Sequence, residues 1–186
     1  ARHVLDSAGL DDVQIEQIPG HLSDHYDPRQ KVLRLNSEVY RSRSLAAVGI
    51  AAHEAGHAIQ DARAYGPLVI RNAAVPIAGF GSGAAIWMVI LGAIFATRIP
   101  LLGMLVPIGI ALFGAFVFFQ LVNLPVEFNA SSRAKAQLVE LGIVSPQELV
   151  YVNKVLNAAA LTYVAATLQA ILTLLYLVLR FAGGRD

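Results

Sequence analysis

The most informative absence in the 186-residue sequence is that of cysteine. Without cysteine the protein has no disulfide, no thiolate zinc ligand and no thiol nucleophile. Any metal ion must therefore be bound by histidine and carboxylate side chains. A strongly basic surface is also missing, because the formal net charge is only +1, so we do not expect nucleic-acid binding.

Charge is scarce as well, at 15% of residues against 56% hydrophobic residues and a mean hydropathy of +0.58. This composition excludes an intrinsically disordered chain. Three long stretches carry no charge: 26 residues between Arg71 and Arg98, 28 between Arg98 and Glu127, and 25 between Lys154 and Arg180. Because about 20 apolar residues suffice for a helix to cross a bilayer, we expect a mainly α-helical integral membrane protein with about three transmembrane helices.

The expected spans divide the chain into four segments. We place the spans at about 73–97, 99–123 and 156–181. Few residues separate the first two spans, so these form a tight hairpin whose ends return to one side of the bilayer. The polar residues then form a small α+β domain at that membrane face. The segments are the N-terminal part of this domain (1–71), the hairpin (72–124), the helical second part of the domain (125–154), and the last span with its tail (155–186).

The distribution of lysine and arginine predicts the orientation in the membrane. Eleven of these residues lie on the side of the polar domain, against Arg98, Arg180 and Arg185 on the other side. Positive residues concentrate on the cytoplasmic side of bilayers. We therefore expect a cytoplasmic polar domain on a bacterial-type inner or cell membrane, with the C-terminus outside. Whether a further span precedes Ala1 stays open.

Local patterns predict the elements of the polar domain. A short helix is expected at 4–8, and a strand within 12–18. The tetrapeptide DPRQ favours a hairpin between 21–26 and a second strand at 31–35. Ser42 or Ser44 can cap a helix that continues to about Ala64.

The second half of the polar domain is expected to be helical. Pro125 indicates a new helix that begins at Asn123 and ends near Leu141, with Gly142 after its last turn. Ser145–Glu148 has the pattern of a capping box. The helix that follows it is expected to continue into the last span.

His53, Glu54 and His57 form the motif H-E-x-x-H within the best-predicted helix. Residues i and i+4 of a helix lie on one face, so both imidazoles can bind one Zn²⁺. Glu54 is turned about 100° around the axis and can act as general base on water activated by the metal. A chance match on a surface helix is the alternative. Two histidines and a glutamate among small residues nevertheless need partners, so we predict one zinc ion per chain.

A catalytic zinc needs a third protein ligand. His3, His21 and His25 lie in the N-terminal stretch. Glu127 is the better candidate, because the predicted hairpin brings its helix back to the side where the motif helix enters the membrane. The alternative is a carboxylate that is stabilised by a helix N-terminus. His21 and His25 share the i, i+4 spacing but fall in a predicted strand, so no second metal site is expected.

The segment AAHEAGHAIQ, followed about 70 residues later by LPVEFNASSRA, resembles the YugP-type membrane zinc metallopeptidases. The stretch YDPRQKVLRLNSEVY also resembles that family, and the similarity covers nearly the whole chain. A more distant resemblance is to the HtpX and CAAX-prenyl proteases. The resemblance implies a zincin-like domain of the gluzincin type, with His53, His57 and Glu127 as ligands and Glu54 as base.

The sequence departs from the resembled pattern at Asn129, where an acidic residue is expected. An aspartate there could orient a ligand histidine through a hydrogen bond outside the metal's own ligands. The carbonyl of Asn129 could accept the same bond without the charge. The departure leaves the level of activity open more than the binding of metal.

Weaker candidates concern the substrate and the reaction intermediate. The strand with Leu33 and Leu35 is expected to be an edge strand that pairs with extended substrate. An ordinary strand of a sheet is the alternative. Arg133 and Tyr151 could stabilise an oxyanion, and a surface or interface position is the alternative for each.

The sequence as a whole predicts a membrane-embedded zinc endopeptidase that acts on membrane-associated proteins or peptides. The alternative is a catalytically weak or inactive zinc-binding scaffold or regulator. A transporter is a weaker option, because the spans contain few polar groups. Oligomerisation is possible but is not predicted.

Overall fold

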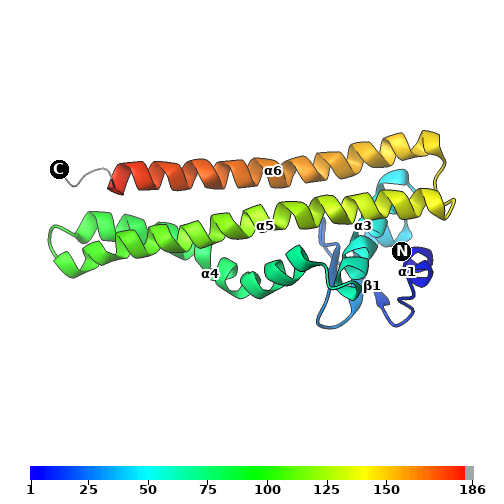
Figure 1. The fold of residues 1–186 in the computed structure, drawn as a ribbon, viewed down its shortest axis with the longest axis horizontal. Coiled ribbons are helices and arrows are strands. Elements are labelled where there is room, and N and C mark those ends of the chain that lie inside the picture. Colours follow the sequence, from blue (N-terminus) through cyan, green and yellow to red (C-terminus); the bar gives the residue numbers. More distant parts are fainter. Residues whose placement is uncertain (183–186) are drawn as a thin grey trace. The chain divides into compact units, whose positions relative to one another are not determined.

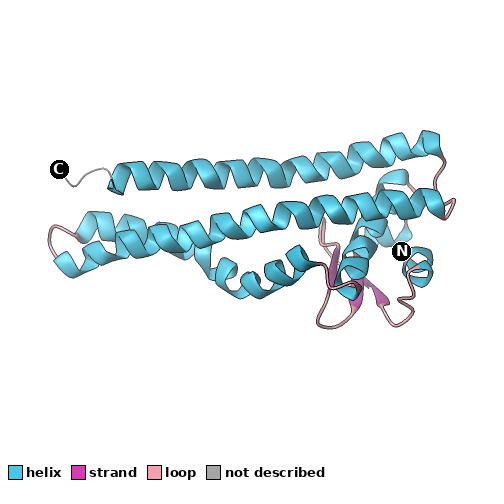
Figure 2. Cartoon of the chain, viewed as in Figure 1, coloured by secondary structure: helices cyan, strands magenta, loops and turns pink. Residues whose placement is uncertain are grey.

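The computed structural model describes residues 1–182, with the side chains of all except 77–81 and 182. The predicted tail, including Arg185, lies outside the described residues. The described chain is mostly helical with one small sheet (Figure 2). Its contacts define two units: unit 1 combines Ala1–Val69 with Pro125–Leu161, and unit 2 combines Ile70–Leu124 with the segment from Thr162 onward.

The first 62 residues supply six elements of unit 1, and the predicted short helix, first strand, hairpin and motif helix are all confirmed. The elements are α1 (Arg2–Ser7), β1 (Gln14–Ile18), β2 (His25–Asp27), β3 (Val32–Asn36), α2 (Ser37–Arg41) and α3 (Leu45–Ala62). The short α2 was not predicted. It begins because the Asn36 side chain accepts hydrogen bonds from the backbone N–H groups of Glu38 and Val39.

The sheet has the strand order β1-β3-β2, with β1 parallel and β2 antiparallel to β3. The prediction that the strand with Leu33 and Leu35 lies at an edge is therefore wrong. Both leucines are buried in the core of unit 1. β3 is buried at four of its five residues, which suits a central strand. The alternation of KVLRL shows which residues face the core but does not show how many neighbours the strand has.

Helix α3 is made mainly of small residues, and these let it pack closely on both sides. Ser44 caps it by accepting a hydrogen bond from the Ala47 N–H, as expected. One side packs on the sheet and α1 through residues such as Ala55 and Ala58. The other side packs through Ala52 on the segments of α5 and α6 that belong to unit 1. The motif residues therefore lie on a helix that is fixed from two directions (Figure 1).

The prediction that a new helix begins at Asn123 is wrong. Helix α5 (Leu105–Glu140) continues through this point with Pro125 in its interior. Proline removes one backbone hydrogen bond, and long apolar helices tolerate this because neighbouring groups compensate. The expectation for Gly142 is confirmed, since it follows α5 with a left-handed φ of 62°.

The predicted capping box is also confirmed. Glu148 accepts hydrogen bonds from the Ser145 N–H and hydroxyl, both at 2.8 Å, and the Glu148 N–H donates back to Ser145 Oγ at 3.3 Å. Helix α6 (Pro146–Ala182) starts there and continues without a break, as expected.

Unit 2 contains most of α4 (Gly66–Phe95), the short η1 (Pro100–Met104), and segments of α5 and α6. Helices α4 and α5 lie side by side as a hairpin (Figure 1) and touch at Gly92 and Gly109. That this hairpin crosses a membrane stays a prediction. A Cβ atom at Gly109 would lie 2.7 Å from the carbonyl oxygen of Ala85. Because Gly92 and Gly109 have no side chains, the backbones of α4 and α5 can approach each other closely.

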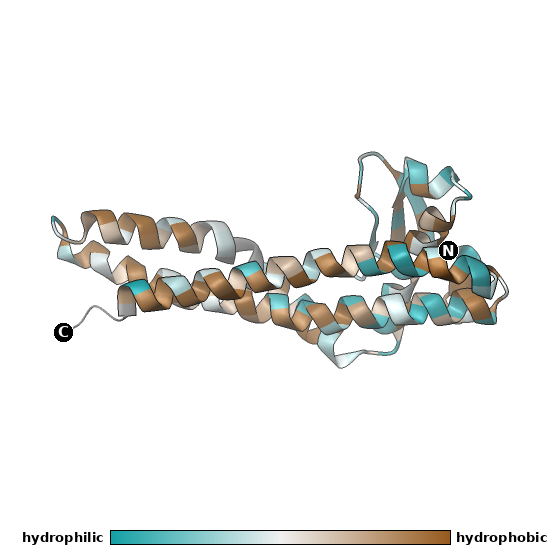
Figure 3. Ribbon diagram, turned by 90° about the horizontal axis from the view of Figure 1, so that it is seen from above, coloured by the Kyte–Doolittle hydropathy of each residue, from teal (hydrophilic) through white to brown (hydrophobic). Residues whose placement is uncertain are grey.

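Within the part of the chain that the structure describes, two helical stretches are long and apolar enough to cross a membrane, Pro100–Glu140 and Pro146–Phe181. In the described part of α4, the apolar stretch is the shorter Ser82–Phe95. Hydrophobic residues dominate the described apolar stretches of α4, α5 and α6 (Figure 3), and many stay exposed, such as Trp87 at 63%. Two of the three expected spans thus meet the length and composition test, and the first remains a prediction.

Candidate metal site

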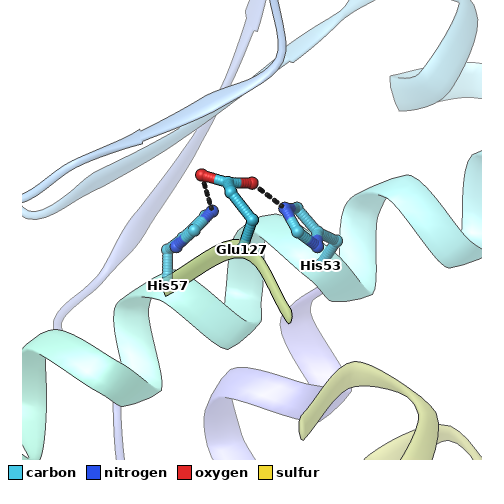
Figure 4. A group of neighbouring side chains, drawn as sticks. All are labelled: His53, His57 and Glu127. Atoms are coloured by element: carbon cyan, nitrogen blue, oxygen red, sulfur yellow. Dashed lines mark hydrogen bonds and ion pairs between the residues drawn. The ribbon is translucent and has the colours of Figure 1, made fainter. Parts of the chain in front are cut away.

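His53 and His57 project from one face of α3, one helical turn apart (Figure 4). Their ring centroids lie 4.7 Å apart, and the ring planes are nearly perpendicular at 86°. Both rings turn Nε2 toward the same place. As the i, i+4 spacing of the motif predicts, the two imidazoles lie on one face of the helix with their Nε2 atoms directed toward the same region.

Glu127 reaches the same point from α5, and its carboxylate lies between the two rings (Figure 4). Oε2 is 3.2 Å from His53 Nε2, and Oε1 is 3.7 Å from His57 Nε2. The Glu127 side chain is nearly inaccessible, with 4% of the residue exposed. The three residues form the one group with suitable metal-binding atoms among the described residues, all within 4.8 Å of one another.

Gly56 explains how Glu127 comes so close to His53, although 74 positions separate them in the sequence. A Cβ atom at Gly56 would lie 2.7 Å from the carbonyl oxygen of Ala130 on α5. Only glycine allows the two helices this approach. Sequence reasoning treated this position as a free one in the motif, and nothing in the spacing pattern marks it.

The second nitrogen of each imidazole also has a partner. His53 Nδ1 lies 3.1 Å from Ser131 Oγ, and His57 Nδ1 lies 3.0 Å from Gln60 Oε1. Hydrogen bonds at the far side of a ligand histidine fix the orientation of its ring. Sequence reasoning missed both partners. The signal was available, since Gln60 follows His57 by three residues and Ser131 follows Glu127 by four, which places each on its neighbour's helix face.

Asn129 acts differently from the expectation. Its Oδ1 accepts hydrogen bonds from Gln60 Nε2 at 3.0 Å and from Arg133 Nε at 2.7 Å. It therefore reaches His57 only through Gln60. The sequence had suggested a direct hydrogen bond between residue 129 and a ligand histidine. Gln60 lies between Asn129 and His57, and a single sequence does not reveal this arrangement.

Electrostatics favour positive charge at this site. Burial alone would lower the pKa of His57, but the nearby carboxylates of Glu127 and Glu54 outweigh it and raise the pKa above its usual value. Glu54 is itself buried beside the histidines on α3. The two carboxylates thus attract either a proton or a metal cation to the imidazoles.

The remaining candidates lie elsewhere. Tyr151 on α6 is 58% exposed, and the Lys154 ammonium lies 5.4 Å from its ring centroid. This is the surface position that was the alternative for Tyr151. His25 lies in β2, and the His21 ring is 3.7 Å from the Glu38 carboxylate on the surface. Among the described residues, no second group of this kind is found, and neither histidine belongs to the group of His53, His57 and Glu127.

Comparisons with known proteins agree with this geometry. A family model described as "Putative neutral zinc metallopeptidase" matches residues 1–182. The "Putative membrane protease YugP" of Bacillus subtilis (strain 168) is 50% identical over 186 residues, which are 100% of this chain and 80% of that protein. The search of solved structures finds no match. On this evidence the chain belongs to the neutral zinc metallopeptidase family.

Proposed function

We propose that this protein is a zinc-dependent endopeptidase, with one Zn²⁺ per chain bound by His53, His57 and Glu127. The observation that carries the proposal is the position of the Glu127 carboxylate between the two Nε2 atoms of the motif histidines. Two imidazoles and one carboxylate form the protein ligand set of many catalytic zinc sites, with one position left open. The family membership supports the same chemistry.

The distances fit a zinc ion. Ligand atoms at about 2.0–2.2 Å from a tetrahedral zinc lie about 3.3 Å from one another. The separation is 3.2 Å from His53 Nε2 to Glu127 Oε2 and 3.7 Å from His57 Nε2 to Glu127 Oε1. One ligand atom from each of the three residues lies within 4.8 Å of the others, so the three side chains are close enough to bind one ion after adjusting around it.

Each protein group has a role in peptide hydrolysis. When bound, zinc would polarise the scissile carbonyl and lower the pKa of water. Glu54 is adjacent to His53 in sequence but is turned about 100° around α3, so it is not a ligand. It takes the proton from the attacking water and passes it to the leaving amine nitrogen. The gluzincin assignment rests on Glu127 as the third ligand.

We further propose that the protein acts at a bilayer. Two long apolar helices support spans at 99–123 and 156–181, and the name of the Bacillus subtilis relative supports a membrane location. A third span at 73–97 is proposed from its charge-free stretch alone. Glu127 follows the second proposed span by four residues in sequence. This spacing supports a site near the membrane face, where membrane proteins or peptides are the substrates. The distribution of lysine and arginine favours the cytoplasmic side.

The test compares the wild type with Glu54→Gln and His57→Ala in zinc content and in cleavage of a peptide library. Glu54→Gln should retain zinc and lose about 10²–10⁴-fold in kcat, whereas His57→Ala should lose both zinc and activity. Full cleavage by Glu54→Gln would contradict the mechanism. If the wild type binds zinc but shows no chelator-sensitive cleavage of any peptide, the result would favour the inactive scaffold instead.

A further inference from the structure

Helices α3 and α5 share a chain of hydrogen bonds that ends on His57. It begins at Arg133 on α5, passes through Asn129 and Gln60, and reaches His57 Nδ1 on α3. Gln60 has 0% of its surface exposed. Its amide therefore has no solvent to bond with, and its partners in the protein decide how it is oriented.

The direction of every bond in this chain follows from Arg133. A guanidinium only donates, so Asn129 must turn its Oδ1 toward Arg133 Nε, 2.7 Å away. The same oxygen and the Val126 carbonyl accept from Gln60 Nε2 at 3.0 and 2.8 Å, which uses both amide hydrogens. Gln60 Oε1 is left to face His57 Nδ1 at 3.0 Å, and it accepts the proton on that nitrogen.

This bond direction decides which nitrogen of His57 is free. A neutral imidazole carries one proton, so a proton on Nδ1 leaves the lone pair on Nε2. Nε2 is the atom 3.7 Å from the Glu127 carboxylate. We propose that Arg133, Asn129 and Gln60 are positioning residues that keep the His57 proton on Nδ1, so that Nε2 binds the metal ion. The inference rests on the proposed zinc site.

His53 provides an internal contrast. Its Nδ1 contacts Ser131 Oγ at 3.1 Å, and a hydroxyl can either donate or accept. Ser131 therefore orients the ring without dictating which nitrogen carries the proton. The role given to Arg133 also differs from the oxyanion role that its position in the sequence suggested, because here its Nε acts on the metal ligand through two intervening amides.

The first experiment measures zinc dissociation constants of the purified full chain by competition with a chelator. Gln60→Met should bind zinc about 10–100-fold more weakly, as is usual when the outer partner of a ligand histidine is lost. Asn129→Ala should also weaken binding. Asn129→Asp should stay close to the wild type, because its carboxylate accepts from both Gln60 and Arg133.

Thermal unfolding of the metal-free proteins separates positioning from general stability. If Gln60→Met does not fold, the comparison of Asn129→Ala with Asn129→Asp decides whether the hydrogen-bond chain positions His57. Equal zinc affinity of Gln60→Met and wild type would overturn the proposal. So would a loss of zinc affinity in Asn129→Asp as large as that in Asn129→Ala, because aspartate keeps the oxygen that accepts from Gln60 and Arg133.

The second experiment separates the two roles of Arg133. As a positioning residue, Arg133→Met weakens zinc binding, and its kcat recovers when zinc is saturating. As an oxyanion donor, it keeps its zinc affinity and loses about 10²–10³-fold in kcat, which would overturn the proposal for this residue. A wild type that binds zinc without cleaving peptides contradicts the proposed peptidase activity, and the affinity series still decides the positioning role.

Discussion

The two units of this protein are stabilised by different means. In unit 1 polar side chains of the interior are joined by hydrogen bonds, as in the chain from Arg133 to His57 and in the bond between His53 and Ser131. In unit 2 the contacts are between apolar residues of three helices, with close approach at Gly92 and Gly109. The candidate metal site thus lies in the unit with directional bonds, while the other unit offers an apolar surface suited to lipid.

The largest expected effect comes from removing the carboxylate that joins α3 and α5 in unit 1. Glu127→Ala should weaken zinc binding by more than about 100-fold, the upper range for loss of an outer partner, because a direct ligand is lost. Peptidase activity should disappear with the zinc. Zinc content after dialysis measures the change, and a fully loaded variant would show that Glu127 is not a ligand.

Metal removal should distinguish the units within one molecule. At a free zinc concentration about 100 times the dissociation constant, the ion stabilises the state that binds it by about 2.7 kcal/mol. We expect a chelator to increase hydrogen exchange of α3 and of residues 125–140 in α5. The amides of residues 82–95 should exchange as before. Equal deprotection of both regions would contradict the division into units.

A matched pair of glycines sharpens the comparison further. A Cβ atom at Gly56 or at Gly109 would lie 2.7 Å from a backbone carbonyl oxygen in each case. Either change to alanine should destabilise its unit by about 1–3 kcal/mol. Gly56→Ala should also weaken zinc binding, because it separates His53 from Glu127, whereas Gly109→Ala should leave zinc affinity unchanged.

Gly114→Ala is the control for this pair, since a Cβ atom there meets nothing within 4 Å. Alanine at this helical position should be neutral or stabilising by about 0.5–1 kcal/mol. Thermal unfolding and chelator competition on the three variants give both readouts. Equal zinc loss in Gly56→Ala and Gly109→Ala would remove the distinction between the two units.

The smallest effect concerns a polar contact of unit 1 that lies between β2 and α3. The Tyr26 hydroxyl donates to Asp61 Oδ2 at 2.8 Å, and Lys31 Nζ donates to the same oxygen at 2.6 Å. Tyr26→Phe should cost about 1 kcal/mol at neutral pH, measured by thermal unfolding. No loss of stability would show that the contact is neutral.

The same tyrosine has a pH dependence with a defined sign. Burial first, and then the hydrogen bond to Asp61, raise the pKa of Tyr26 above its usual value. The folded state therefore holds this proton more tightly than the unfolded state. The contribution is fully present below about pH 10, the unfolded value, and is lost as the pH rises through the folded value. Tyr26→Phe should weaken the alkaline loss of stability.

The sequence predicted those features that depend on local pattern. The Ser44 cap, the capping box at Ser145 and the i, i+4 pair of histidines are all local, and all appear as expected. The proximity of Glu127 to the motif histidines was expected because the α4–α5 hairpin follows from the charge-free stretches. Both inferences use spacing along a helix or a length requirement, which one sequence displays. The role of Glu127 as a ligand stays a prediction.

The features that were missed depend on three-dimensional partners. Alternation in β3 does not reveal that β1 adds to its far edge, so the edge position was predicted wrongly. Pro125 normally marks a helix start, but here α5 continues through it. Gln60 looked like any polar residue after the motif, and only the structure shows that it joins His57 to Asn129.

The proposed function depends on His53, His57 and Glu127 binding one zinc ion. X-ray absorption at the zinc edge of the purified protein tests it most directly. The account predicts one zinc per chain, with two imidazole nitrogens at about 2.0–2.1 Å and a carboxylate oxygen at about 2.0–2.2 Å. The carboxylate signal should disappear in Glu127→Ala. A protein without bound zinc, or a zinc ion with fewer than two imidazole ligands, would contradict the account.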